Sequence, residues 1–268
     1  MEHLGRILES TGHLPTPFLA IDETVMAGNI RRMQAACDTA GIGLRPHIKT
    51  HKSAEIARRQ LDAGAVGVTC ATLSEAIALG EAGCPTDVYV STPIFFDHPK
   101  RVLLERAVGL HSRVTLTADS TTIAGSTPTA PHALAQPVTE LRPGTYVFGD
   151  HQQVTLGACR PEDLAAVVVS TVIHVSDGRF VIDAGAKALS KDRAEWLESY
   201  GHVVCHDHAV IDRLNDNHGM VEGRPVDVGE RVMVVPNHIC PVVNLFDELV
   251  MVGEAVRTIP VELRGSLE

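Results

Sequence analysis

The stretch LRPHIKTHKSAEIARRQLDAGAVGV, residues 44–68, contains a complete strand–helix–strand pattern. An apolar strand starts at Leu44, a segment with helical period begins after Ser53 and closes before Gly64, and another apolar run starts near Val66. This order is typical of βα units whose strands lie parallel in one sheet. The stretch therefore predicts an α/β domain.

The same pattern repeats on both sides of this stretch. Five strand-like runs alternate with helical stretches, and they start near Phe18, Leu44, Val66, Val88 and Val114. Each unit has about the length that a (β/α) barrel requires. We therefore predict that residues 14–130 form an α/β domain with part of a TIM-type barrel.

The composition changes after this region. From Thr121 to Glu140 the chain is rich in Thr, Ser, Pro, Ala and Gly without a usable period, which is typical of a loop or linker. Runs such as RVMVVPNH and ELVMVGEAV follow, separated by Gly, Asp and Asn turns. Residues 140–262 are therefore predicted to form a mainly β domain.

Composition and charge exclude several classes of protein. The 268 residues include 23 Lys and Arg against 33 Asp and Glu, a net charge of -10, whereas nucleic acids and anionic membranes are bound by basic surfaces. No run approaches about 18 uninterrupted apolar residues, and the first twenty residues lack the apolar core of an export signal. These features predict a cytoplasmic protein that binds a small molecule.

A basic segment, RPHIKTHK at residues 45–52, lies at the end of the second predicted strand. Barrels carry their chemistry at the carboxyl ends of their strands. A partly desolvated Lys49 or Lys52, close to His47 and His51, could have its pKa lowered enough to form a Schiff base. The same four residues are also typical of a solvated loop, so both interpretations stay open at this point.

Two further segments contain possible ligand-binding groups. In PNHICP, residues 236–241, His238 and Cys240 are two positions apart, so an extended backbone would project this zinc-type pair to one face. The alternative is a buried thiol beside a surface histidine.

In AGSTPT, residues 124–129, small and hydroxyl residues could hold a phosphate through backbone N–H groups, or could be a simple linker.

Other histidines are more ambiguous. His218 either belongs to a turn or reaches into a site. One further group has metal-ligating residue types but is favoured as surface: His202, Cys205, His206 and His208.

Six segments occur in the order expected of the D-threonine aldolase and D-serine dehydratase family: RPHIKTHK, GSTPT, LRPGTYVFGD, DAGAKALSKD, LNDNHG and PNHICPVVN. The sequence resembles this family over residues 14–120 and 125–262. The resemblance implies a fold-type III enzyme of pyridoxal 5'-phosphate (PLP), with an alanine racemase-like N-terminal barrel and a C-terminal β domain.

The resemblance also implies the roles of particular residues. It places the PLP lysine on Lys49 and the metal pair on His238 and Cys240. The loop that holds the cofactor phosphate falls on Gly125, Ser126 and Thr127. A cysteine as second metal ligand implies zinc, whereas aldolases of the family with aspartate there are similar to manganese or magnesium enzymes.

The implied reaction is that of a lyase acting on a D-3-hydroxyamino acid, by dehydration or by aldol cleavage. Such a reaction needs a base, and the sequence does not rank three candidates: His47, His51 and His218.

One departure from the family pattern concerns the barrel. A closed barrel needs eight βα units and only five precede the phosphate-type loop, so about three units, roughly ninety residues, are missing between Asp119 and Ser126. An open parallel sheet leaves an edge that invites association, so either a homodimer covers this edge or the chain is a damaged or internally deleted relative. Because of the missing units, two alternatives to an active lyase stay open. One is a catalytically impaired pseudoenzyme that binds PLP or zinc, and the other is a protein that binds no cofactor.

Overall fold

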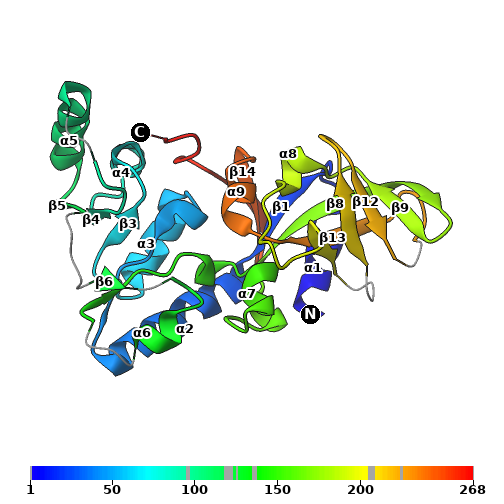
Figure 1. Ribbon diagram of the computed structural model, residues 1–268, viewed down its shortest axis with the longest axis horizontal. Coiled ribbons are helices and arrows are strands. Elements are labelled where there is room, and N and C mark those ends of the chain that lie inside the picture. The colour runs from blue at the N-terminus through cyan, green and yellow to red at the C-terminus, as the bar shows by residue number, and fades with distance from the viewer. Residues whose placement is uncertain are drawn as a thin grey trace. The chain divides into compact units, whose positions relative to one another are not determined.

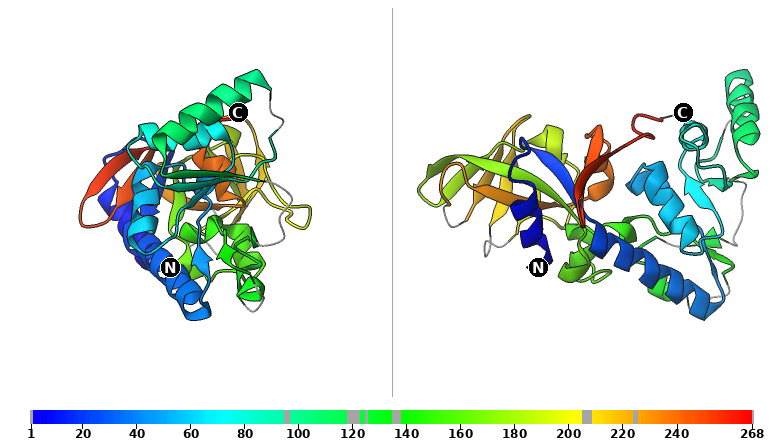
Figure 2. Two further views of the ribbon diagram at one scale, coloured as in Figure 1. Left: turned by 90° about the vertical axis from the view of Figure 1, so that its left-hand side faces the viewer. Right: turned by 180° about the vertical axis from the view of Figure 1, so that it is seen from behind.

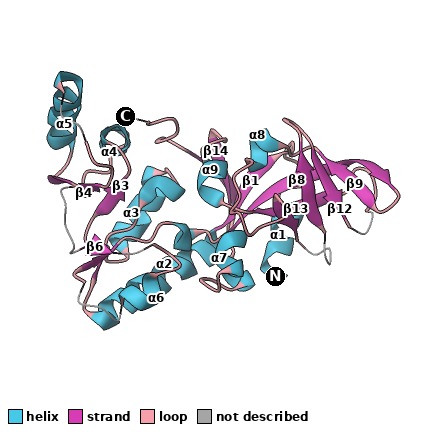
Figure 3. Cartoon of the chain, in the orientation of Figure 1, coloured by secondary structure: helices cyan, strands magenta, loops and turns pink. Residues whose placement is uncertain are grey.

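The computed structural model describes residues 2–94, 97–117, 123–124, 126–134, 138–204, 209–223 and 226–267. The chain forms two compact units. Unit 1 comprises residues 1–27 and 148–259, and unit 2 comprises residues 28–147 and 260–268. Figure 3 shows unit 1 to consist mainly of strands, whereas short strands and helices alternate in unit 2.

The described part of unit 1 contains one nine-stranded sheet and several short helices. Its strands are β1 (Phe18–Asp22), β8 (Ala166–Ser176), β9 (Arg179–Ile182), β10 (Gly201–Val203), β11 (Val210–Leu214), β12 (Gly219–Glu222), β13 (Arg231–Pro236), β14 (Glu248–Val252) and β15 (Val256–Pro260). Its helices are α1 (Glu2–Ser10), α7 (His151–Thr155), the 3-10 helix η3 (Pro161–Asp163), α8 (Ala186–Leu189) and α9 (Ile239–Val243).

Strand β8 closes six of these strands into a barrel. Its first half, rich in buried β-branched valines, pairs antiparallel with β13, and its second half pairs antiparallel with β9. The order around the ring is therefore β8, β13, β10, β11, β12 and β9. Strands β8, β13, β12 and β9 are labelled in Figure 1. The predicted mainly β second half is confirmed, and the structure shows that this part is a closed barrel.

Strand β1 belongs to this same sheet. It lies between β8 and β14 (Figure 2), pairing antiparallel with β8 and parallel with β14. All five of its residues are buried. The assignment of Phe18–Asp22 to the first barrel unit of the N-terminal domain is therefore corrected. Its apolar sequence is explained by neighbouring strands on both sides, which both come from the second half of the chain.

Unit 2 carries the remaining described elements. Its strands are β2 (Gly43–Leu44), β3 (Val68–Cys70), β4 (Asp87–Val90), β5 (Arg113–Leu116), β6 (Ile123–Ala124) and β7 (Glu140–Leu141). Its helices are α2 (Glu23–Ala40), which begins in unit 1, η1 (Ile48–Thr50), α3 (Ala54–Asp62), α4 (Leu73–Glu81), α5 (His98–Leu110), α6 (Ala130–Ala133) and η2 (Thr145–Val147).

The strands of unit 2 form a row of parallel strands. Sheets β2-β7-β6 and β3-β4-β5 are both parallel, and a parallel bridge between His47 and Thr69 joins them. Among the described residues, the end strands β5 and β6 do not pair with each other, so the row is not closed into a ring there. The predicted α/β partial barrel is confirmed. The predicted gap between Asp119 and Ser126 lies largely outside the described residues.

Helices α3 and α4 cover this row. Ala57 and Ala76 pack with Val68 and Val88 in one buried cluster, and small residues let the helices approach the sheet closely.

In the described parts of the chain, no helix is long and apolar enough to cross a membrane. The homodimer stays a prediction.

Candidate functional site

Lys49 lies on a short turn whose backbone is tightly packed. It is the middle residue of η1, where its neighbours Ile48 and Thr50 are buried while Lys49 itself is exposed. A Cβ atom at Gly144 would lie 2.7 Å from Thr50 Oγ1 and 2.9 Å from the His47 carbonyl oxygen, so only glycine fits against this turn. The turn is thereby fixed while the Lys49 side chain extends from it.

Lys52 has a different environment. Its side chain is buried, its Nζ atom lies 3.3 Å from Glu75 Oε1, and it donates a hydrogen bond of 3.5 Å to the Leu263 carbonyl oxygen. In contrast, the Lys49 side chain makes no hydrogen bond or ion pair within the described residues. Of the two lysines that the sequence offered, Lys49 is the one available to a ligand, and Lys52 is a structural residue.

The buried Lys52–Glu75 pair predicts a large loss of stability on neutralising Glu75. Glu75→Gln keeps an acceptor for the Ala71 N–H group but leaves the ammonium of Lys52 buried without a counter-charge. Breaking a buried ion pair in this way costs about 3 kcal/mol or more. We expect urea unfolding to show a correspondingly lower free energy of unfolding.

The same helix offers a matched control. Glu81 forms an ion pair with Arg106, and both side chains are largely exposed, at 47% and 58%. Glu81→Gln should therefore change the free energy of unfolding by less than about 1 kcal/mol. Equal effects of the two variants would contradict the structural role of the buried pair.

His51 is fully buried and both of its ring nitrogens are engaged. Nε2 lies 3.1 Å from Gln60 Oε1, and Nδ1 accepts a hydrogen bond of 3.2 Å from the Ser53 N–H group. Burial lowers the pKa of His51 to about 4. His51 is therefore a neutral core residue, and it is removed from the candidate bases.

The lowered pKa of His51 predicts a pH-dependent stability. Its ordinary pKa is 6.5, so unfolded chains bind the proton more readily between pH 6.5 and about 4. The contribution of His51 is fully present above pH 6.5, and about 3 kcal/mol is lost as the pH falls to 4. His51→Gln should flatten the fall in unfolding free energy between pH 7 and 4.5, measured by chemical denaturation. The control is His98→Gln, at an exposed position on α5, which should leave the pH dependence of the unfolding free energy as in wild type. If both variants changed this pH dependence equally, the role of His51 would be refuted.

His47 supports the turn that carries Lys49. Its Nδ1 atom accepts a hydrogen bond of 3.4 Å from the Lys49 N–H group, and its Nε2 atom lies 3.2 Å from Ser91 Oγ. Burial, together with the nearby charges of Lys49 and Arg142, lowers the pKa of His47 to about 3. Neither ring nitrogen is free. The third candidate base, His218, is exposed at the turn between β11 and β12 in unit 1.

Arg142 is a residue of this region that the sequence analysis missed. Its guanidinium carbon lies 4.7 Å from the centre of the Tyr89 ring, and its charge acts on His47. Its Nε atom is buried and has no hydrogen-bond partner in the described parts of the chain. An unsatisfied buried donor is costly, and an anionic group of a bound molecule would satisfy it. Unit 2 thus fits an anionic cofactor such as PLP.

The phosphate-type loop is described in part, because Gly125 lies outside the described residues. Thr127 is buried, and its hydroxyl oxygen accepts a hydrogen bond of 3.0 Å from the Tyr146 N–H group. The hydroxyl keeps its own hydrogen for donation to a ligand. Ser126 is exposed, and its N–H group donates a hydrogen bond of 2.9 Å to Thr129 Oγ1.

His238 and Cys240 form a second candidate site, in unit 1. His238 caps the N-terminus of α9, and Asp192 Oδ2 lies 2.5 Å from its Nδ1 atom. Asp150 holds the same turn, because its carboxylate accepts a hydrogen bond of 3.1 Å from the Ile239 N–H group. Burial lowers the pKa of His238, but its hydrogen bonds to Cys240 and Asp192 and the charges of Cys240 and Asp150 outweigh burial and raise the pKa to about 9.

The side chains of His238 and Cys240 meet for a reason other than the predicted one. The expectation that both lie on an extended backbone is wrong, because Cys240 lies in the first turn of α9. The turn from strand to helix brings the thiol within hydrogen-bonding reach of the imidazole. Imidazole, thiol and a carboxylate on the ring nitrogen suit a zinc ion. No group of three or more metal-ligating side chains that could hold a metal ion occurs among the described residues.

The remaining histidine cluster supplies no site in the described residues. His202 stacks on His151, with ring centres 6.0 Å apart. The other three members of the cluster lie outside the described residues: Cys205, His206 and His208.

Comparisons with known proteins match both halves of the chain. The model for the alanine racemase N-terminal domain matches residues 21–117, and the model for a putative serine dehydratase domain matches residues 165–252. D-threo-3-hydroxyaspartate dehydratase of Delftia sp. HT23 is 28% identical over 346 residues, covering 85% of this chain and 91% of that enzyme. This alignment is longer than the 268-residue chain, so it spans positions that the relative has and this chain lacks.

Solved structures share the fold. D-threonine aldolase from Filomicrobium marinum matches with a TM-score of 0.80 at 20% identity, covering 95% of this chain and 96% of that one. Two variants of D-threo-3-hydroxyaspartate dehydratase match at 24% identity, with TM-scores of 0.71 and 0.68. The match to the first variant covers 97% of this chain and 98% of the variant's chain. The match to the second covers 94% of this chain and 98% of the variant's chain. One has a histidine replaced by alanine; the other, described as metal-free, has a cysteine two positions later replaced.

Proposed function

Because this chain belongs to the D-threonine aldolase and D-serine dehydratase family of fold-type III PLP enzymes, we propose that it is a PLP- and metal-dependent lyase of D-3-hydroxyamino acids. The observation that carries the proposal is the environment of Lys49. This exposed lysine stands on a rigid turn, whereas the neighbouring Lys52 is held by Glu75. The family resemblance and the local geometry both support Lys49 as the residue that binds PLP.

In this proposal, residues of unit 2 hold PLP. The amine of Lys49 would bond to the carbonyl carbon of the cofactor, and Arg142 would supply a charged donor to one of its anionic groups. Thr127, Ser126 and Gly125 would hold the phosphate. When bound, PLP acts as an electron sink for the α-carbon of an amino acid. His47 would keep the turn in place, because it accepts the Lys49 N–H hydrogen bond.

Residues of unit 1 would hold the metal. His238 and Cys240 offer imidazole and thiolate, a donor set that favours zinc over manganese or magnesium. The replaced histidine and cysteine in the hydroxyaspartate dehydratase variants have the same spacing of two positions. A zinc ion supplies Lewis acidity to a substrate hydroxyl. The pair's role would be to hold that ion with open positions for a substrate oxygen.

Product analysis tests the proposal and separates the two reactions. Purified protein with PLP and zinc is incubated with D-serine, D-threonine or D-threo-3-hydroxyaspartate, and with the L-enantiomers as controls. With a dehydratase the substrate loses its hydroxyl and α-proton as water, and the resulting enamine then takes up water and releases ammonia, leaving a 2-oxo acid. An aldolase with D-threonine gives glycine and acetaldehyde. The absence of both kinds of product from every D-substrate would contradict the lyase proposal.

A second candidate function is a PLP- or zinc-binding protein without turnover. It is favoured by the open row of unit 2 and by the length of the alignment with the hydroxyaspartate dehydratase. Binding of PLP to Lys49 without any product would support this candidate.

A further inference from the structure

We propose that Asp192 is the positioning residue of the metal pair, and that the loop of residues 190–200 between α8 and β10 holds it in place. The inference rests on the proposed metal site at His238 and Cys240. It adds a residue 46 positions away from His238 in sequence, which acts on the metal through the imidazole.

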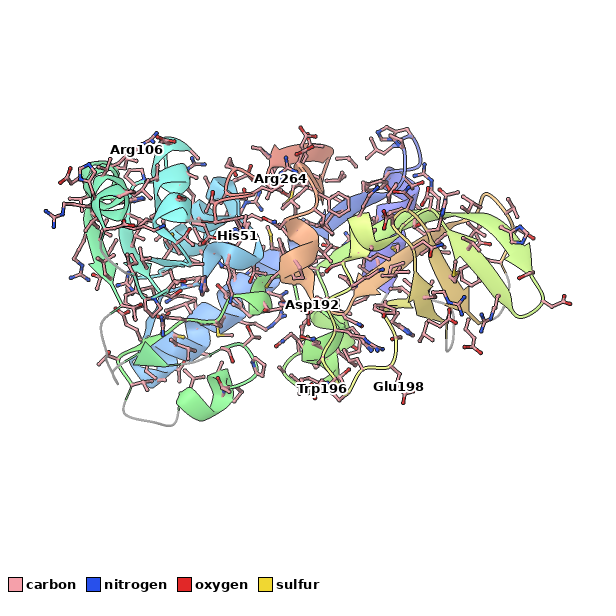
Figure 4. The ribbon with its side chains drawn as sticks, turned by 45° about the horizontal axis from the view of Figure 1, so that its top comes forward. His51, Arg106, Asp192, Trp196, Glu198 and Arg264 are labelled. Atoms are coloured by element: carbon pink, nitrogen blue, oxygen red, sulfur yellow. The ribbon has the colours of Figure 1, made fainter. Side chains whose placement is uncertain are left out.

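The contact between Asp192 and His238 is short and directed at one ring nitrogen. Asp192 Oδ2 lies 2.5 Å from His238 Nδ1, and Asp192 lies beside α9 (Figure 4). A carboxylate in this position keeps the proton on Nδ1, which leaves the Nε2 lone pair for a metal. It also fixes the ring plane. Both effects are those of the carboxylate–histidine–metal arrangement in known metal sites.

The loop carrying Asp192 is ordered by its own hydrogen bonds. The Asp192 N–H group donates a hydrogen bond of 3.1 Å to Ser190 Oγ. Arg193 donates to the carbonyl oxygens of Leu197 and Glu198, at 3.1 Å and 2.8 Å. Its guanidinium carbon also lies 5.0 Å from the centre of the Tyr200 ring. The carboxylate is therefore presented by a closed loop.

A second contact ties the other end of this loop to the residue before His238. Asn237 is buried, and its Nδ2 atom donates a hydrogen bond of 2.5 Å to the Ser199 carbonyl oxygen. Adjacent residues 237 and 238 thus hold both ends of the same loop. An adventitious surface ion pair would need neither this second attachment nor the internal bonds of the loop. The arrangement is that of a support built around one histidine.

Zinc affinity of the purified full-length protein tests the inference without turnover. Zinc is titrated against a chromophoric chelator, without PLP or substrate, for wild type, Asp192→Asn and His238→Ala. Removal of such a supporting carboxylate costs about 10- to 100-fold in metal affinity. We expect this loss for Asp192→Asn, a larger loss for His238→Ala, and partial recovery for Asp192→Glu.

Asp216→Asn is the matched control, because Asp216 is 77% exposed in the same unit and lies 3.8 Å from Lys187. It removes the same charge and should leave zinc affinity unchanged. Wild-type affinity in Asp192→Asn, or an equal loss in Asp216→Asn, would overturn the inference while leaving the metal pair intact. Failure of the folded wild type to bind zinc would overturn the metal site and the inference together. Cobalt gives a second readout. At a cobalt concentration that does not saturate the site, the thiolate–cobalt absorbance should be weaker in Asp192→Asn, because less metal is bound.

Discussion

Lys49→Ala is expected to prevent covalent attachment of PLP to this protein. The reason is that Lys49 is exposed on the packed turn η1, whereas Lys52 is buried in an ion pair. Wild type is incubated with PLP and reduced with borohydride, and the digested protein is analysed by mass spectrometry. The modification should lie on Lys49, and the variant should retain less than about one-thousandth of any lyase activity.

Two controls sharpen this prediction. Lys187→Ala removes another largely exposed lysine, in unit 1, and should leave labelling unchanged. Lys52→Met should lower the free energy of unfolding, because Glu75 loses its partner, but the folded fraction should still be labelled at Lys49. A modified peptide carrying Lys52, or full labelling of Lys49→Ala, would contradict the assignment.

Cys240→Ser is expected to remove metal-dependent activity. Cys240 and His238 are the two proposed protein ligands, and a serine hydroxyl is a far weaker zinc ligand than a thiolate. We expect zinc affinity to fall by more than about 100-fold and lyase activity by a similar factor, because the substrate hydroxyl loses its Lewis acid. Equilibrium dialysis measures the first effect, and product formation with added zinc measures the second.

The matched control is Cys159→Ser, which alters another partly exposed cysteine of unit 1. It should bind zinc and turn over substrate as wild type does. Removal of zinc by a chelator should reproduce the Cys240→Ser result in wild type. Activity that survives both the chelator and Cys240→Ser would show that the metal pair has no role in the reaction.

Local elements were predictable where the sequence carries a local signal. The helix expected between Ser53 and Gly64 is α3, because its apolar spacing and the glycine that follows it act over a few residues. The valine-rich run of β8 likewise indicates a buried strand. By contrast, the four apolar residues of β1, Phe18 to Ile21, indicate a strand but not its partners, which lie more than 140 residues away.

The identity of the main candidate site residues could be predicted from the sequence, but their contacts could not. The resemblance led to Lys49, His238 and Cys240, but spacing alone could not separate Lys49 from Lys52. That distinction depends on Glu75, which approaches Lys52 from helix α4. The contribution of Arg142 and Asp192 was missed for a similar reason, although both lie in segments that carried the resemblance. Their partners come from other elements, and no sequence period marks such contacts.

The most direct test of the proposed lyase is the visible absorbance of the wild-type protein with PLP and zinc. The account predicts a band of protein-bound PLP that shifts when a D-3-hydroxyamino acid is added, stays unchanged with the L-enantiomer, and returns as product accumulates. A well-folded sample that shows no such band, or a band that responds to neither enantiomer, would contradict the account.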